Sequence, residues 1–309
     1  MKTIFLFSGQ GSQYCGMGRE LAEAFPSEAD EIFTLGEKIL GFDIKEIMLE
    51  GTAEQLSQTR ISQPAIFTMS LLCLSAARKK GIEAEAVAGH SLGEYAALVA
   101  SGMLTAEQGF TAIKHRAAAM DKAAKENPGG MAAVLNLSSA EIEKICTEIT
   151  KAGAYVTPVN YNSPAQTVIA GTSEGVAKAS EALKEAGAKR VMPLAVSAGF
   201  HSELMRTAAE EFKALVSDLP FGEPNIGFYS NVLGARLTDF SDMPSLLAKH
   251  ICSPVRFVDE LNALRADGYD NFVELGPGKV LTGLVKKTLD GVRAVNIETP
   301  ETLEAALAL

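Results

Sequence analysis

The residues best suited to chemistry lie between positions 87 and 95, in the run Val-Ala-Gly-His-Ser-Leu-Gly-Glu-Tyr. Small apolar residues typical of a strand lead into a glycine, Ser91 follows between two glycines, and a helical pattern covers residues 92–101. This is the G-x-S-x-G nucleophile elbow in its strand–turn–helix setting. The turn places the hydroxyl of Ser91 at a helix N-terminus, where the unpaired N–H of Leu92 faces an oxyanion. We therefore predict a serine nucleophile, although such a turn can also simply join a strand to a helix.

A second glycine-containing loop follows the first predicted strand, residues 3–7. It reads Gly-Gln-Gly-Ser-Gln over residues 9–13, and its glycines permit a close approach of the backbone to a ligand. It lacks the spacing of a phosphate-binding loop. A nucleophile elbow needs one N–H from the residue after the serine and one from a separate strand-end loop. Residues 9–13 are thus a candidate for the second half of an oxyanion hole, and a plain turn is the alternative.

A general base for this serine is expected among the four histidines. His201 lies in the short Gly-Phe-His-Ser loop before a helix predicted over residues 203–216, a position typical of catalytic groups. Of the other three, His90 lies in the elbow, His115 lies beside Arg116, and His250 ends a helical run. No Asp or Glu stands out as a third triad member, and a backbone carbonyl can orient a histidine instead. We therefore favour a dyad of Ser91 and His201.

Arg116 lies on a predicted helix, residues 105–125, among alanines and a methionine. A guanidinium on an apolar helix face is costly unless it is paired. It either reaches the surface or a nearby glutamate, or it forms a bidentate clamp for a substrate carboxylate, which suits a guanidinium better than an ammonium group. Spacing alone leaves both interpretations open.

Composition excludes several classes of protein. The chain has 309 residues, 47% of them hydrophobic, which is enough for one large domain or a main domain with a smaller one. A formal net charge of -10 and the lack of a long basic run argue against nucleic-acid binding. The short basic clusters at residues 189–190 and 286–287 are usually solvated helix ends, but they could receive an acidic partner.

Cysteine usage and hydropathy predict a cytoplasmic protein. The four cysteines form no C-x-x-C pair and lack metal-ligand spacing, so we expect free thiols and no metal site. The N-terminal residues lack the pattern of a signal peptide. No apolar run approaches ~20 residues, so no membrane span is expected.

Pattern changes along the chain predict two domains. Residues 28–80 are helical with loop signals at Gly36, Gly41 and Gly51, and Pro64 fits the first turn of a long apolar helix at 61–77. After a break at residues 127–130 the pattern becomes βαββαβ, which is the ferredoxin-like arrangement. Its strands are expected at 131–137, 155–161, 166–170 and 189–193, and its helices at 138–151 and 173–186. We predict an α/β main domain over 1–127 and 195–309, with a small domain inserted at 128–194.

The remaining C-terminal pattern supplies fewer elements. A helix is expected around residues 245–251, and another opens after residues 253–257. A strand is expected at 271–275, followed by a glycine-proline turn and a closing helix.

Six motifs taken together resemble one family, the malonyl-CoA:acyl-carrier-protein transacylases of bacterial fatty-acid synthesis, which are related to polyketide-synthase acyltransferase domains. They are Gly9 to Gln13, Gly89 to Tyr95, Arg116, Gly199 to Ser202, Ser253-Pro254-Val255 and Glu274 to Gly278. The resemblance covers essentially the whole chain. It implies an α/β-hydrolase-like main domain with a mostly parallel sheet and the small ferredoxin-like insertion.

The resemblance also implies a role for each site residue. Ser91 is the nucleophile, His201 its base and Arg116 the ligand of the malonyl carboxylate. The backbone N–H groups of Gln10 and Leu92 form the oxyanion hole. Two further residues have implied roles: Phe200, before the histidine, goes with malonyl rather than methylmalonyl, and His250, at a position that is commonly glutamine, orients the histidine through its backbone carbonyl.

The function implied is transfer of malonyl from malonyl-CoA to the phosphopantetheine thiol of acyl carrier protein, through an ester on Ser91 and without a cofactor. The partners expected are malonyl-CoA and the carrier protein, with neither nucleic acid nor membrane. Three alternatives remain: a serine thioesterase or hydrolase on a similar elbow, an acyltransferase acting in trans on a polyketide synthase, and a non-catalytic subunit that docks carrier protein.

Overall fold

A six-stranded sheet carries both glycine-containing loops. In the computed structural model, which describes residues 1–196 and 198–308, its strand order is β10-β9-β1-β2-β7-β8. The first five strands in this order run parallel and β8 pairs antiparallel with β7. The strands are β1 (Thr3–Phe7), β2 (Ala86–Gly89), β7 (Gly227–Ser230), β8 (Ala235–Arg236), β9 (Asn271–Leu275) and β10 (Arg293–Ile297). Ser197 and Leu309, within the predicted 195–309 segment, lie outside the described residues.

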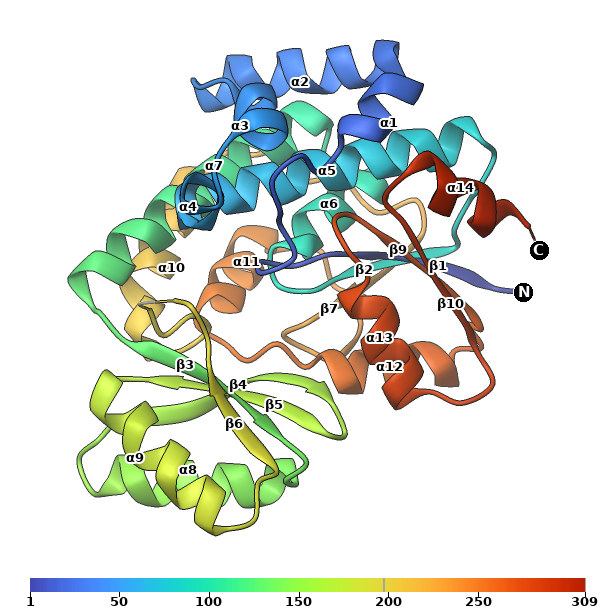
Figure 1. Ribbon diagram of the computed structural model, residues 1–309. Coiled ribbons are helices and arrows are strands. Elements are labelled where there is room, and N and C mark those ends of the chain that lie inside the picture. The colour runs from blue at the N-terminus through green and yellow to red at the C-terminus, as the bar shows by residue number, and fades with distance from the viewer. Residues whose placement is uncertain (197, 309) are drawn as a thin grey trace.

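Side chains of the central strands alternate between two buried layers, as the two-residue period of a strand requires. On β1, Phe5 and Phe7 pack into one hydrophobic cluster, whereas Ile4 and Leu6 pack into another. Both faces are covered, which explains why the strands read as continuous apolar runs. Figure 1 shows α5 (Thr59–Lys79) and α6 (Gly93–Ala100) above this sheet and α12 (Phe257–Ala266) and α13 (Val280–Thr288) below it.

Thirteen helical segments of the described residues lie outside the inserted unit; some cover this sheet directly, and others pack on the covering helices. The N-terminal ones are α1 (Arg19–Ala24), α2 (Pro26–Leu40), α3 (Ile44–Glu50), α4 (Ala53–Ser57), α5 (Thr59–Lys79), α6 (Gly93–Ala100) and α7 (Ala106–Glu126). The C-terminal ones are the 3-10 turn η1 (Glu203–Met205), α10 (Arg206–Val216), α11 (Met243–Ile251), α12 (Phe257–Ala266), α13 (Val280–Thr288) and α14 (Pro300–Leu307).

A separate antiparallel sheet is formed between positions 130 and 193, with strand order β4-β5-β3-β6. Its elements follow in the order β3 (Gly130–Leu135), α8 (Ser139–Lys151), β4 (Val156–Ser163), β5 (Gln166–Gly171), α9 (Ser173–Glu185) and β6 (Arg190–Pro193). Both helices pack on the sheet through a hydrophobic cluster of their own. An α/β fold with a mostly parallel sheet and this second sheet confirms the coarse fold prediction.

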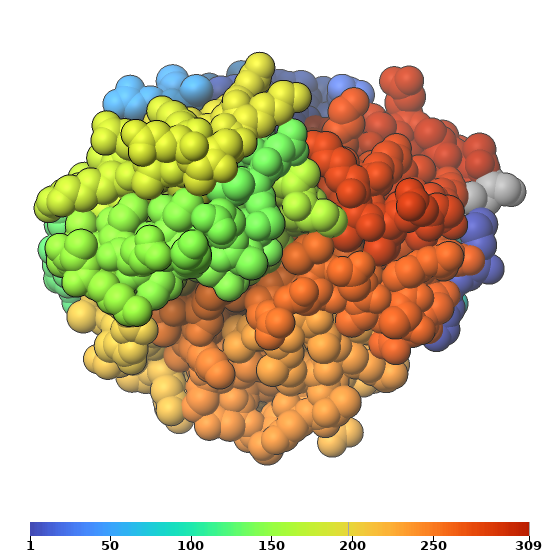
Figure 2. Space-filling model, turned by 90° about the horizontal axis from the view of Figure 1, so that it is seen from below, coloured from blue at the N-terminus to red at the C-terminus, as the bar shows by residue number. Residues whose placement is uncertain are grey.

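The two sheets are connected by backbone pairing as well as by the chain itself. The N–H of Val255 donates to Val159 O at 2.8 Å, and the N–H of Tyr161 donates to Val255 O at 2.9 Å. Pro128 and Ala198, which flank the inserted segment, form an antiparallel bridge. Figure 2 shows this green and yellow unit against the orange and red C-terminal segments.

Two sequence-based expectations in the helical region were wrong. Gly36 lies inside α2 rather than in a loop, because its missing side chain makes room for Phe110: an added Cβ would lie 3.0 Å from that ring. Pro64 lies inside α5 rather than in its first turn, because the helix begins earlier, at Thr59. Gly41 and Gly51 do follow helix ends, as expected.

Candidate active site

The two glycine-containing loops meet at the carboxyl ends of neighbouring strands. Phe7 and Gly89 are partners in the β1–β2 pairing, and the His90 N–H donates to Phe7 O at 3.0 Å. This approach leaves no room for side chains: an added Cβ at Gly9 would lie 2.7 Å from His90 O, and one at Gly93 would lie 2.1 Å from Phe7 O. The glycines of both motifs therefore bring the two loops together.

Ser91 occupies the sharp turn between β2 and α6. Its φ of 54° is left-handed, a conformation that non-glycine residues rarely adopt and that marks functional strain. Its N–H donates to Asn231 Oδ1 at 2.7 Å, and its Oγ lies 2.6 Å from His201 Nε2. The turn thus presents the hydroxyl directly to the imidazole.

The His201 ring is held in one tautomer. Its Nδ1–H faces two backbone carbonyls, His250 O at 2.9 Å and Ser253 O at 3.2 Å. A proton on Nδ1 leaves the lone pair of Nε2 free to accept the proton of Ser91. His201 is 4% exposed, and burial, with the nearby His250 and Arg116, holds its pKa well below the ordinary 6.5. The ring is therefore neutral near pH 7, as a general base requires.

No carboxylate completes a triad among the described residues at His201. Among the acidic residues that follow His201 in the chain, Glu274 is buried but accepts the N–H groups of Leu281 and Thr282 and the hydroxyl of Ser8. Asp242 caps α11, and Asp259 pairs with Arg256. The imidazole is oriented by carbonyl dipoles instead.

Arg116 is 1% exposed and points into the site from α7. Its Nη1 donates to Gln63 Oε1 at 2.6 Å and its Nη2 donates to Ser91 Oγ at 3.1 Å, while its Nε has no hydrogen-bond partner among the described residues. The guanidinium lies over the ring of Tyr95, 5.4 Å from its centroid. Burial lowers the pKa of Arg116, yet an arginine stays charged in proteins. Among the described residues, no carboxylate pairs with this buried cation beside the serine.

The backbone N–H groups of Gln10 and Leu92 make no hydrogen bond with the described residues. Gln10 follows Gly9 in the first loop, and Leu92 is the N-cap of α6. Their loops end adjacent parallel strands on the same edge of the sheet. Two free donors therefore flank the serine turn.

Phe200 and His250 lie on the two segments that hold His201. Phe200 is 7% exposed and belongs to the main hydrophobic cluster. His250 is at the end of α11; its carbonyl accepts from His201, and its own buried ring has its centroid 5.4 Å from that of His201. His250 Nδ1 lies 3.1 Å from Glu94 Oε2, but without the alignment of a hydrogen bond.

Sequence patterns did not identify three polar residues that contact this group. Gln63 binds Arg116, Asn231 binds the Ser91 N–H, and Asn162 Oδ1 accepts from His90 Nε2 at 2.8 Å. Gln63 falls in an apolar helix and Asn231 follows the short, unpredicted strand β7. Asn162 lies on β4 and reaches the elbow from the second sheet.

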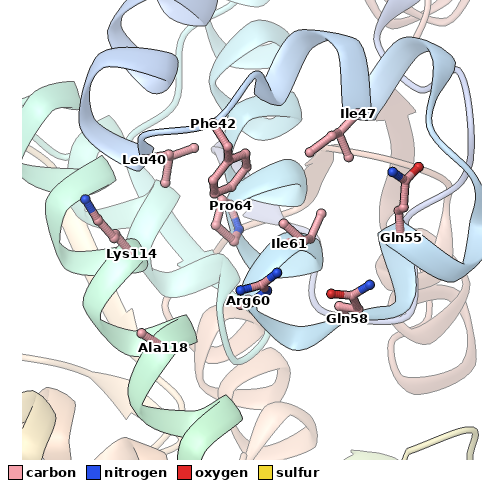
Figure 3. A pocket seen from close by; sticks show the side chains of 10 residues that line it. All are labelled: Leu40, Phe42, Ile47, Gln55, Gln58, Arg60, Ile61, Pro64, Lys114 and Ala118. Atoms are coloured by element: carbon pink, nitrogen blue, oxygen red, sulfur yellow. The ribbon is translucent and has the colours of Figure 1, made fainter.

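A cavity of about 470 Å³ lies elsewhere, between α3, α5 and α7 (Figure 3). Apolar side chains such as Phe42 and Ile61 line it together with Arg60 and Lys114, and neither Ser91 nor His201 takes part. In the described parts of the chain, no cluster of His, Cys, Asp and Glu suits a metal ion. Over the same residues, no helix has the length and apolar character that crossing a bilayer requires.

Comparison with known proteins identifies the relatives of this chain. Residues 4–302 match the acyl transferase domain family. The malonyl CoA-acyl carrier protein transacylase of Bacillus subtilis is 40% identical over 99% of this chain and 96% of its own length. The enzyme of the same name from Escherichia coli K12 is 38% identical over 99% and 98%.

Solved structures agree. A malonyl CoA-acyl carrier protein transacylase from Clostridium perfringens superposes with a TM-score of 0.95 at 36% identity, over 100% of this chain and 96% of that one. A malonyl-transacylase solved in complex with its type II PKS acyl-carrier protein gives 0.95 at 35% identity, over 99% of both chains. Similarity over the full length in both sequence and structure shows that this chain belongs to the acyl transferase family that includes the malonyl CoA-acyl carrier protein transacylases.

Proposed function

We propose that this chain transfers malonyl from malonyl-CoA to the phosphopantetheine thiol of acyl carrier protein, supplying extender units for fatty-acid synthesis. The observation that carries the proposal is the guanidinium of Arg116, which is buried 3.1 Å from Ser91 Oγ and has no carboxylate partner in the part of the chain that the structure describes. A buried cation beside a nucleophile favours an acyl group that ends in a carboxylate. An acetyl group would leave this cation unpaired.

The first half-reaction loads the enzyme. His201 Nε2 takes the proton of Ser91 while Oγ bonds to the thioester carbonyl carbon, and the carbonyl electrons move onto oxygen. When they return, the carbon–sulfur bond breaks and coenzyme A leaves with the proton from His201. A malonyl ester on Ser91 remains.

The second half-reaction repeats these steps with the thiol of the carrier protein. His201 takes the thiol proton, sulfur attacks the ester carbon, and Ser91 leaves with that proton. The proposed cycle is ping-pong and uses only groups of this chain, without a cofactor. The free N–H groups of Gln10 and Leu92 receive the oxyanion in both halves, a contribution of about 3 kcal/mol per donor.

Phe200 and His250 have supporting roles in this proposal. The bulk of Phe200 beside His201 favours an unbranched malonyl group over a methylated one. The carbonyl of His250 keeps the proton of His201 on Nδ1, and its 2.9 Å distance supports this role.

The same proposal extends to the domains. We propose an α/β-hydrolase-like main domain, residues 1–127 and 195–309, with a ferredoxin-like domain at 128–194. The strand order β4-β5-β3-β6 and the two helices on one face support the ferredoxin-like assignment. The four free thiols support a reducing compartment, the cytoplasm.

Incubation with malonyl-CoA alone, followed by carrier protein, tests the function. We expect mass spectrometry to find a stable malonyl adduct on Ser91, which holo carrier protein then removes as malonyl-carrier. Rapid release of free malonate would identify a hydrolase instead, and no adduct would identify a non-catalytic docking subunit. Ser91→Ala is the control that must abolish labelling.

A polyketide carrier is the second candidate acceptor, because one similar solved structure holds a type II PKS acyl-carrier protein. The chemistry is the same, so the chase distinguishes the two. Faster transfer to a fatty-acid carrier protein than to a polyketide one supports fatty-acid synthesis, and the reverse order supports the alternative.

A further inference from the structure

Asn231 lies buried beneath the nucleophile turn, directly after β7. Its Oδ1 accepts the N–H of Ser91 at 2.7 Å, and its Nδ2 donates to Gly89 O at 2.6 Å. The same Nδ2 donates to Glu260 Oε2 at 2.7 Å. One side chain therefore holds the backbone on both sides of the turn, two residues apart, and connects it to α12.

The side-chain amide of Asn231 uses both of its N–H donors and its oxygen in these contacts. The amide offers two N–H donors, which go to Gly89 O and Glu260, and its oxygen accepts from Ser91. Only one orientation of the amide fits, because turning it over would direct an NH₂ group at the N–H of Ser91. The backbone N–H of Asn231 is itself fixed by Glu94 Oε1.

Glu260 is a buried carboxyl group that the proposed reaction does not use. Its Oε2 binds Asn231, and its Oε1 has no hydrogen-bond partner among the described residues. Burial, with repulsion from Glu94, raises the pKa of Glu260 well above its ordinary value. A neutral carboxyl at this position accepts from the amide without placing a second full charge beside Glu94.

The left-handed turn needs such a partner. Ser91 has φ of 54°, which is unfavourable for a residue with a side chain and persists only where the surroundings hold it. An unpaired buried N–H would add to that cost. Asn231 supplies the hydrogen bond that a regular strand or helix would have provided.

We propose that Asn231, fixed by Glu260, is a positioning residue that keeps Ser91 in its left-handed conformation with Oγ directed at His201. The inference rests on the proposed role of Ser91 as nucleophile. It concerns the geometry of the serine and leaves the Arg116 clamp unchanged, so it predicts a loss in kcat rather than in binding.

The first test is Asn231→Ala, with Asn271→Ala as the matched control. Asn271 is also a buried asparagine, which donates to Thr3 Oγ1 and accepts from Arg293 Nη1, both at 2.9 Å, far along β9 from the serine. We expect kcat for malonyl transfer to fall about 100-fold in Asn231→Ala with KM nearly unchanged, the scale for a nucleophile misplaced by about 1 Å. Asn271→Ala should lower thermal stability but keep kcat within about twofold.

An isosteric exchange covers the case in which Asn231→Ala does not fold. Asn231→Asp keeps the oxygen that accepts from Ser91 but puts a second oxygen against Gly89 O, which cannot donate, so kcat should fall by a similar factor. Glu260→Gln alone keeps an oxygen that can accept from Asn231 Nδ2, so its kcat should stay closer to that of the wild type.

Two readouts separate this inference from the proposed function. A fluorophosphonate probe reports the reactivity of Ser91 without any malonyl group, and malonyl-CoA labelling of the wild type reports the function. If the wild type reacts with the probe but not with malonyl-CoA, the function fails while the positioning test still stands. Equal probe reactivity of wild type and folded Asn231→Ala, or of wild type and folded Asn231→Asp, would overturn the inference.

Discussion

Arg116 is the residue whose surroundings say most about the substrate. Within the described residues, its guanidinium binds Gln63 and Ser91 while its Nε has no partner, so a malonyl carboxylate can replace the weaker contacts bidentately. We expect Arg116→Ala to reduce kcat/KM for malonyl-CoA roughly 100-fold, about 3 kcal/mol, and acetyl transfer much less. Steady-state assays with both thioesters measure the ratio.

The control for this prediction is Arg116→Lys. It keeps the charge but loses the planar fork, so it should recover only part of the malonyl rate. Equal losses for malonyl and acetyl transfer in Arg116→Ala would refute the clamp.

The pH dependence of acylation follows from His201. Its pKa lies well below 6.5 because of burial and the neighbouring His250 and Arg116, and only the neutral ring accepts a proton. We therefore expect the acid limb of the kcat/KM profile to lie below pH 6.5, with activity lost as the pH falls through the folded-state pKa. An acid limb at or above pH 6.5 would contradict this prediction.

Folding stability, like activity, decreases as the pH falls. The pKa of His201 is lower in the folded chain, so the unfolded chain binds a proton more readily, and the free energy of unfolding decreases as the pH falls from 6.5 toward the folded-state pKa.

His250→Gln keeps the orienting carbonyl but removes a neighbouring imidazole. It should move the acid limb to higher pH, which pH–rate profiles of the two enzymes will show.

Residues with a local signature could be predicted from the sequence, and residues defined by folding could not. Ser91, Arg116 and His201 stood out by motif or by an unusual setting, and in the structure Arg116 and His201 both lie within hydrogen-bond distance of Ser91 Oγ. Asn231 and Gln63 are ordinary polar residues in sequence. They matter only because tertiary packing buries them against the reactive groups.

At the scale of elements, the prediction followed hydrophobic pattern and capping chemistry. The strands at residues 3–7 and 271–275 were predicted with the observed bounds, and α7 begins with the expected cap at Thr105. The strands β7 and β10 and the helix α14 were missed. Strand β7 has only four residues, and β10 mixes polar and apolar residues, so neither shows a clear period.

The contact between β1 and α6 is an element-scale prediction. Gly93→Ala would place Cβ 2.1 Å from Phe7 O, so we expect a loss of about 3 kcal/mol or more of folding free energy and little activity. Gly283→Ala is the matched control, because α13 has open space there and alanine should stabilise the helix by about 0.5–1 kcal/mol. Urea unfolding curves compare the two; similar stabilities would contradict the close approach.

On the scale of the whole molecule, the side chain of Asn162 connects the inserted unit to the catalytic turn. Asn162 on β4 accepts from the His90 ring at 2.8 Å, joining the second sheet to the elbow. We expect Asn162→Ala to admit water to the serine ester and raise malonate release from malonyl-CoA about tenfold. Malonate formed without carrier protein measures this leak.

The neighbouring Tyr161→Phe is the control for this variant. It removes a hydrogen bond to Glu143 that lies within the small unit, so its malonate release should match the wild type. A leak of equal size in both variants would argue against a sealing role for Asn162.

The carbonyl pair at His201 Nδ1 has a consequence for the choice of attacking group. Without an anionic partner, and with Arg116 nearby, the imidazolium formed during attack is stabilised only weakly. A thiol, which ionises near about 8.5, needs less help from such a base than water, which is a far weaker acid. Ser91 is also a weak acid, but its hydroxyl is already held 2.6 Å from Nε2. Among attackers that arrive from outside the chain, the base therefore favours sulfur over the far more abundant solvent.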